Sequence, residues 1–332
     1  MFACLRVNPD TPHGAVCVLA HINLIESRHD PVMLGGVSES ASALRIRFWG
    51  VRGSVSASGR QFMEFGGHTP CLEVCCGDKL FVVDAGTGIS ALGPALGAMT
   101  PDEVDILLSH LHLDHVTGLA FFKPAVLGRR VIRTWCGNLG GASAKDALDR
   151  LYAPPLFPIH LDQLPATFEH RGFKAGETLH FGDIAVRTHG LNHPNGSTGY
   201  RFDFAGASLC YISDIEHSYP WPPDDLAAFV ANADLVVYDG MFTEAEYPAC
   251  KGWGHSTWQK GVELCRVAGA KALAIVHLYP EHDDATLRAM EAELQRAMPG
   301  AFIAREGQEI ALSGAPRARG AKGAVPSAAT AR

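Results

Sequence analysis

The chain has 332 residues, of which 47% are hydrophobic and 19% are charged, so we expect a compact fold with a sizeable core, which excludes a wholly disordered chain. A formal net charge of −7 excludes a general attraction to polyanions, although it leaves room for a small anion at a local site. The nine cysteines are odd in number and form no CxxC pair, which excludes a disulfide framework and predicts a cytoplasmic protein.

Residues 1–43 are predicted to be a partly disordered N-terminal extension that ends in the linker-like run GGVSESASA. Its apolar stretch GAVCVLAHINLI lacks a basic lead-in and a small-residue cleavage site, so we expect neither a signal peptide nor a membrane span. Residues 44–313 are predicted to form one domain. Residues 314–332 are small, basic and low in complexity, which predicts a disordered tail.

The first half of the domain is rich in strand patterns. In LRIRF (44–48), apolar residues alternate with arginines, which is the period of a half-buried strand. The runs CLEVCC and KLFVVDA are separated by Gly77-Asp78, a dipeptide typical of hairpin turns. The pattern then predicts a helix at 88–98 and strands at 104–110 and 130–136.

The second half alternates strands with helices. Strands are predicted at 183–190, 198–204, 208–214, 234–240 and 271–277. Helices are predicted at 224–231, 256–270 and 284–298. Strands that are first grouped by hairpins and then alternate with helices predict an α/β (α+β) fold of two mixed sheets with helices packed outside.

A dense polar cluster follows the strand at 104–110, in SHLHLDHVTGL (109–119). His110 and His112 are two positions apart at a strand end, so both rings can face one metal ion. Asp114 and His115 follow as the chain turns and can face a second position. Imidazole and carboxylate together suit zinc, manganese or iron. The alternative is a solvated polar loop that contains these residues by chance.

More metal-binding residue types stand directly after apolar runs elsewhere in the chain. His193 lies in GLNHPNGSTGY, Asp214 ends LCYISD, and His277 ends LAIVH. Each residue alone is more often a hydrogen-bonded cap, but their order along the chain together with the HxHxDH cluster is specific.

Over about residues 45–312, the chain resembles the metallo-β-lactamase superfamily of binuclear metallohydrolases. The resemblance implies a four-layer αββα sandwich and two divalent metal ions, with zinc favoured over manganese or iron. By position in the motifs, it implies that the first metal ion is bound by His110, His112 and His193, that the second is bound by Asp114, His115 and His277, and that Asp214 bridges both. Asp84, in FVVDAGTG, matches the superfamily's buried aspartate behind the ligands.

Two features favour the phosphodiesterase branch. Asp214 stands where the true β-lactamases lack a bridging carboxylate, and a carboxylate can hold two cations close together. GWGHSTWQKG resembles the GHST motif of ribonuclease Z and related phosphodiesterases, whose histidine assists phosphate cleavage. Ser256 with Gln259 predicts a capping box at a helix start, with His255 directly before it. We therefore expect His255 to be the general acid.

FWGVRGSV, FGGHTPCLEV and HLYPEHDD add a similarity to cyclic-phosphate phosphodiesterases of phosphonate breakdown. This chain has His68 where asparagine is expected, and it lacks a cysteine-rich zinc site. Candidates for a substrate pocket are His68, His217 and Trp253, together with Glu216 next to His217.

The function expected from these motifs is hydrolysis of a small cyclic phosphate or cyclic nucleotide. A metal-bridging hydroxide attacks phosphorus, Asp114 orients it, and His255 protonates the leaving oxygen. The alternatives are a ribonuclease Z-type tRNA 3′ endonuclease, a lactonase or thioesterase, and a non-catalytic metal-bound sensor. The expected partner is a small phosphodiester, with RNA second and no membrane; a homodimer is compatible with the sequence.

Overall fold

The computed structural model of the chain describes residues 43–137 and 143–312. The predicted extension before residue 43 and the predicted tail at 314–332 lie outside the described residues. Within the described part, no helix is long and apolar enough to cross a membrane.

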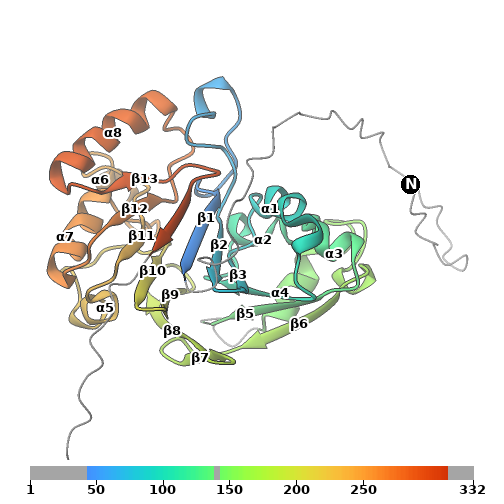
Figure 1. Cartoon of the computed structure of the whole chain (residues 1–332). Coiled ribbons are helices and arrows are strands. Elements are labelled where there is room, and N and C mark those ends of the chain that lie inside the picture. Colours follow the sequence, from blue (N-terminus) through green and yellow to red (C-terminus); the bar gives the residue numbers. More distant parts are fainter. Residues whose placement is uncertain (1–42, 138–142, 313–332) are drawn as a thin grey trace, which may run out of the picture. The chain divides into compact units, whose positions relative to one another are not determined.

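The first sheet has seven strands and is mixed (Figure 1). β1 to β3 and β14 pair antiparallel, whereas β3 to β6 run parallel. In spatial order the strands are β14 (Glu309–Leu312), β1 (Leu44–Gly50), β2 (Cys71–Cys76), β3 (Lys79–Val83), β4 (Glu103–Leu108), β5 (Val131–Cys136) and β6 (Thr167–Gly172).

The second sheet also has seven strands, antiparallel from β7 to β10 and parallel from β10 to β13. In spatial order they are β13 (Phe302–Ile303), β12 (Leu273–Val276), β11 (Leu235–Asp239), β10 (Ala207–Ile212), β9 (Ser197–Phe204), β8 (Ile184–Leu191) and β7 (Thr178–Phe181). The two mixed sheets confirm the predicted arrangement.

Helices cover the outer faces of both sheets (Figure 1). α1 (Ile89–Leu96), α3 (Lys123–Leu127) and α4 (Ala144–Leu151) share an apolar cluster with the first sheet, beside the short α2 (Leu113–Val116). α5 (Asp224–Val230), α7 (Trp258–Ala268) and α8 (Asp284–Ala297) pack on the second sheet, and the one-turn α6 (Tyr247–Cys250) precedes α7. The order helix, sheet, sheet, helix confirms the expected four-layer sandwich.

The inner faces of the two sheets meet in the main core. Phe81 and Leu107 of the first sheet belong to one buried cluster with Phe202 and Leu209 of the second. The rings of Phe81 and Phe202 lie 5.6 Å apart between centroids. This burial fixes the two sheets against each other, and so it fixes the loops at their ends.

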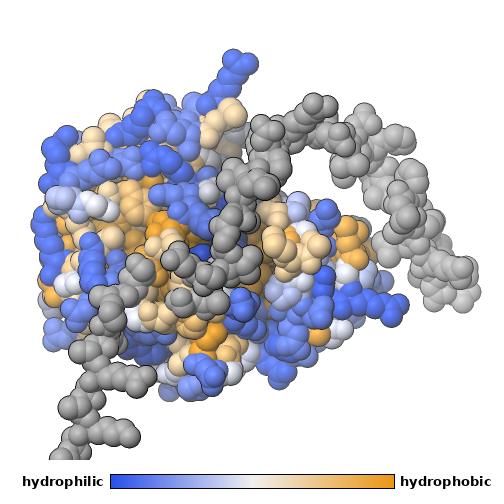
Figure 2. Space-filling model, in the orientation of Figure 1, coloured by the Kyte–Doolittle hydropathy of each residue, from blue (hydrophilic) through white to orange (hydrophobic). Residues whose placement is uncertain are grey.

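The surface carries both hydrophilic and hydrophobic residues. Figure 2 shows hydrophilic residues around the periphery of one face and hydrophobic ones gathered toward its middle. Large exposed hydrophobic side chains include Leu113, Phe121, Leu127 and Leu156.

Three details differ from the sequence-based expectations. β4 ends at Leu108, so His110 and His112 lie in the loop after the strand rather than on it. The predicted capping box at Ser256 is wrong: Thr257 is the N-cap residue of α7, and its side chain accepts from the Lys260 amide. The Ser256 hydroxyl instead contacts Tyr238 and His217, which draws it away from the helix end. Four strands, β6, β7, β13 and β14, and the helices α2, α3, α4 and α6 were not predicted.

Phe202→Ala is expected to lower the free energy of unfolding by about 3–5 kcal/mol, because it leaves a cavity between the sheets. The matched control, Val267→Ala on the exposed face of α7, should cost less than about 0.5 kcal/mol. Denaturant unfolding of both variants measures the difference, and equal stabilities would contradict the assigned core.

Candidate metal centre

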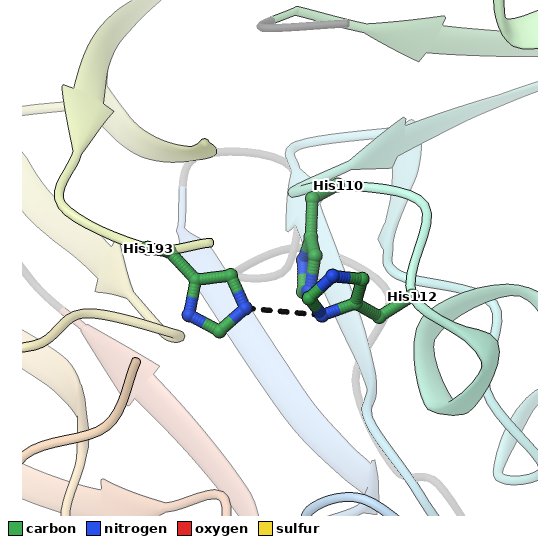
Figure 3. A group of neighbouring side chains, drawn as sticks. All are labelled: His110, His112 and His193. Carbon is green, nitrogen blue, oxygen red and sulfur yellow. Dashed lines mark hydrogen bonds between the residues drawn. The ribbon is translucent and has the colours of Figure 1, made fainter. Parts of the chain in front are cut away.

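The loop that follows β4 brings two histidines together with a third from the second sheet. The rings of His110 and His112 lie 4.3 Å apart between centroids. His193 follows β8, and its Nε2 lies 3.1 Å from Nδ1 of His112, as Figure 3 shows. One ring nitrogen from each of the three lies within 4.8 Å of the others, so this group could hold a metal ion.

A second group lies beside the first. Asp114 and His115 are on α2, whereas His277 follows β12 of the second sheet. Oδ2 of Asp114 lies 3.1 Å from Nε2 of His277 and 3.3 Å from Nε2 of His115. This triplet also has the spacing of a cation site.

Asp214 lies between the two groups. It follows β10, is 1% exposed and has a positive φ of 60°. Its carboxylate is 3.2 Å from Nε2 of both His115 and His277. It is also 3.8 Å from Nε2 of His110 and of His193. Asp214 is therefore placed as a carboxylate shared by both groups would be.

Burial and the neighbouring carboxylates shift the pKa values of the histidines in this cluster in opposite directions. Burial lowers the pKa of His110, His112 and His193. Burial acts the same way on His115 and His277, but Asp214 and Asp114 outweigh it. The pKa of His115 is held well above its usual value, and that of His277 is raised to about 9. The buried carboxylates of Asp214 and Asp114 thus favour positive charge at the positions of these two imidazoles.

The residues fit divalent cations. The donors are imidazole nitrogens and carboxylate oxygens, the set that suits zinc, manganese or iron. Nε2 of His110 is buried and has no hydrogen-bond partner among residues 43–137 and 143–312, which is costly unless a ligand satisfies it.

Asp84 lies behind the cluster and fixes the imidazole of His115. It is fully buried after β3, and its Oδ2 lies 2.9 Å from Nδ1 of His115 and accepts from the Tyr211 hydroxyl at 2.9 Å. Its Oδ1 accepts from the Ser109 amide at 2.7 Å. A carboxylate on Nδ1 leaves Nε2 of His115 directed at the carboxylates of Asp114 and Asp214.

The loop between β1 and β2 closes one side of the site. The Ser54 amide donates to Oδ2 of Asp114 at 2.8 Å. Gly53 packs so closely that a Cβ atom there would lie 2.5 Å from Nδ1 of His277. Any side chain at position 53 would displace that imidazole.

His255 lies beside the cluster. Its Nδ1 is 2.9 Å from Oδ2 of Asp239, and its ring stacks on that of His277 with 4.8 Å between centroids. Asp239 ends β11 and was not predicted from the sequence. The sequence nevertheless shows at Asp239 the same signal that identified Asp214, namely an aspartate at the end of an apolar strand.

A cavity of about 450 Å³ opens onto this centre. Two apolar side chains stand among its polar ones. It is lined by Ser54, Leu111, His112, Leu113, Asp114, Asp214 and His255.

The predicted pocket residues His68, His217 and Trp253 are not among the residues lining this cavity. Nδ1 of His68 contacts the Thr87 hydroxyl, and Nδ1 of His217 contacts the Ser256 hydroxyl. Trp253 is 56% exposed. The geometry gives His68 and His217 supporting contacts, and it leaves Trp253 at the surface next to the loop of His255.

Comparison with known proteins agrees with the fold and the motifs. A stretch of 92 residues is 32% identical to the ribonuclease Z of Gemmatimonas aurantiaca and spans 28% of this chain and 29% of that protein. The ribonuclease Z of Methanopyrus kandleri is 24% identical over 295 residues, which cover 80% of this chain and 96% of that one. A solved diphosphatase from the PhnP family superposes with a TM-score of 0.59 at 16% identity, covering 80% of this chain and 97% of that one.

The family model described as the beta-lactamase superfamily domain matches residues 80–278, which include every residue of the two candidate metal-binding groups. The chain therefore belongs to the β-lactamase superfamily, as its two-sheet sandwich and its HxHxDH loop had indicated.

Proposed function

We propose that the chain is a two-metal phosphodiesterase that cleaves a small diester, with a cyclic phosphate or cyclic nucleotide favoured. One observation carries the proposal. The Asp214 carboxylate lies between two groups that could hold cations, and His255, whose Nδ1 contacts Asp239, lines the same cavity.

The residues that would hold the cations are His110, His112 and His193 on one side and Asp114, His115 and His277 on the other, with Asp214 shared. Divalent cations bound there would polarise a phosphoryl oxygen and supply hydroxide near neutral pH. Asp114 accepts from the Ser54 amide, which fixes its carboxylate at the cavity wall and lets it orient the attacking oxygen.

His255 is proposed to protonate the leaving oxygen. Its Nδ1–H donates to Asp239, which fixes the tautomer and directs Nε2 away from Asp239. Asp239 is itself held by the amides of Ile215 and Met241, so the carboxylate cannot swing away. The Asp239 contact thus fixes the orientation of the imidazole, which a general acid requires.

Ribonuclease Z activity is the second candidate, favoured by the relatives of that name that align with most of this chain. The expected tRNA-gripping arm would fall within 137–175. There, residues 143–172 include α4, which packs on the first sheet, and β6, the edge strand of that sheet, whereas 138–142 lie outside the described residues. The cavity lining contains no lysine or arginine among the described residues. Both features favour a small substrate.

Asp214→Asn is expected to reduce bound metal from two equivalents to one or fewer and to abolish diester hydrolysis, because the shared anionic ligand is lost. Metal analysis after gel filtration measures this. Asp225→Asn, whose side chain is 75% exposed, is the control and should keep both ions. Full metal occupancy in Asp214→Asn would contradict the bridging role.

His255→Ala is expected to keep both metal ions and to lose about 10²- to 10⁴-fold in kcat on a cyclic nucleotide, whose alkoxide must be protonated. Hydrolysis of bis(4-nitrophenyl) phosphate should change little, because nitrophenolate leaves without a proton. His189→Ala is the control, since that ring stacks on Phe229 instead. Wild-type turnover of the cyclic nucleotide by His255→Ala would refute the acid role.

A substrate panel separates the two candidates. For a small diester, kcat/KM should change little between about 50 and 200 mM salt, whereas binding of a precursor tRNA would weaken steeply with salt. Preferred cleavage of precursor tRNA at its 3′ end, with such a salt dependence, would favour the ribonuclease Z alternative.

A further inference from the structure

The loop that carries His255 is held by a carboxylate outside the cavity. Gly252 and Gly254 lie in left-handed conformations, with φ of 92° and 91°, between α6 and α7. The Gly252 amide donates to Oε1 of Glu216 at 2.6 Å, and the Gly254 amide donates to Oε2 at 3.0 Å. The Tyr247 hydroxyl also donates to Oε1, at 2.9 Å. The Glu216 carboxylate thus accepts hydrogen bonds from three donors. Hydrogen bonds to an ionised carboxylate are stronger than those between neutral groups.

Glu216 is itself tied to the segments that carry two candidate ligands, Asp214 and His193. It lies two residues after Asp214 in the chain. Its amide donates to the Asn192 carbonyl at 2.7 Å, and the Asn192 side chain donates to its carbonyl at 2.9 Å. Asn192 directly precedes His193, so Glu216 ties the segments of two candidate ligands to the loop.

Gly254 connects the loop held by Glu216 to both His193 and His255. The carbonyl of Gly254 accepts from Nδ1 of His193 at 2.7 Å, and the next residue is His255. A Cβ atom on Gly254 would lie 2.3 Å from Cδ of Pro194 and 2.5 Å from Nδ1 of His193. A loop packed this closely cannot shift without moving His255 relative to the cluster.

We propose that Glu216 is a positioning residue that holds the 252–254 loop so that His255 reaches the leaving oxygen. Glu216 does not line the cavity, so it acts through the loop and not on the substrate. This inference rests on the proposed role of His255 as general acid.

Glu216→Gln tests the inference, because the amide keeps the size of the side chain but replaces one acceptor oxygen with a group that cannot accept from a glycine N–H. The assay uses aryl phosphodiesters whose leaving groups range from 4-nitrophenol to phenol. For wild type, kcat should depend weakly on the leaving group. For Glu216→Gln it should fall about 10-fold or more for phenol and little for 4-nitrophenol, with both metal ions retained.

Three comparisons make the result decisive. Glu244→Gln, whose carboxylate accepts one hydrogen bond within the described part of the chain, from the Thr257 hydroxyl at 3.4 Å, should behave as wild type. Tyr247→Phe removes one of the three donors and should shift kcat in the same direction by a smaller factor, which tests the inference if Glu216→Gln folds poorly. His255→Ala should show the strongest dependence on the leaving group.

The outcomes separate the inference from the proposed function. If His255→Ala depends steeply on the leaving group and Glu216→Gln does not, the positioning role is wrong and the general acid stands. If Glu216→Gln loses metal or slows every ester equally, its role is only structural, which also overturns the inference. If His255→Ala shows no dependence, the acid role fails and the inference with it.

Discussion

The burial of four carboxylates among imidazoles is the constraint on which this structure depends. Asp84, Asp114, Asp214 and Asp239 are each at most 8% exposed. A buried anion without a partner is strongly unfavourable, so each must be paired or hydrogen-bonded. Asp84, Asp114 and Asp214 lie against His115, His277 or both, and Asp239 lies against His255. Divalent cations bound there would supply positive charge to the carboxylates and need neutral imidazoles as ligands, so metal binding would be coupled to pH.

Both sheets are needed to satisfy that constraint. The first sheet supplies Asp84 and the loop from His110 to His115, and the second supplies His193, Asp214, Asp239 and His277. Three of these residues have positive φ: Asp84 at 63°, Asp214 at 60° and His277 at 57°. Each such conformation costs about 1–3 kcal/mol for a residue other than glycine and persists only where the surroundings enforce it. The packed core between the sheets supplies that enforcement.

The sequence predicted most of this arrangement because strand periodicity and strand-end polar residues are local signals. The strands that carry the cluster were placed within a few residues, and all seven proposed ligands lie together in the structure. The sequence could not predict the contacts between loops that are distant along the chain. In the sequence, nothing distinguishes Asp239 from other strand-end aspartates; only the structure places it 2.9 Å from His255. β6 is edge-placed and half-exposed, so its sequence TFEHRG carries no clear alternation. Ser256 satisfied the local rule for a cap, but tertiary contacts to Tyr238 and His217 prevailed.

The most direct test of the two-metal account is a titration of the metal-free protein with zinc, followed by the rate of bis(4-nitrophenyl) phosphate hydrolysis. The account predicts that hydrolysis rises with added metal and reaches its plateau at two equivalents per chain. A plateau at one equivalent, or no hydrolysis at any metal concentration, would contradict it.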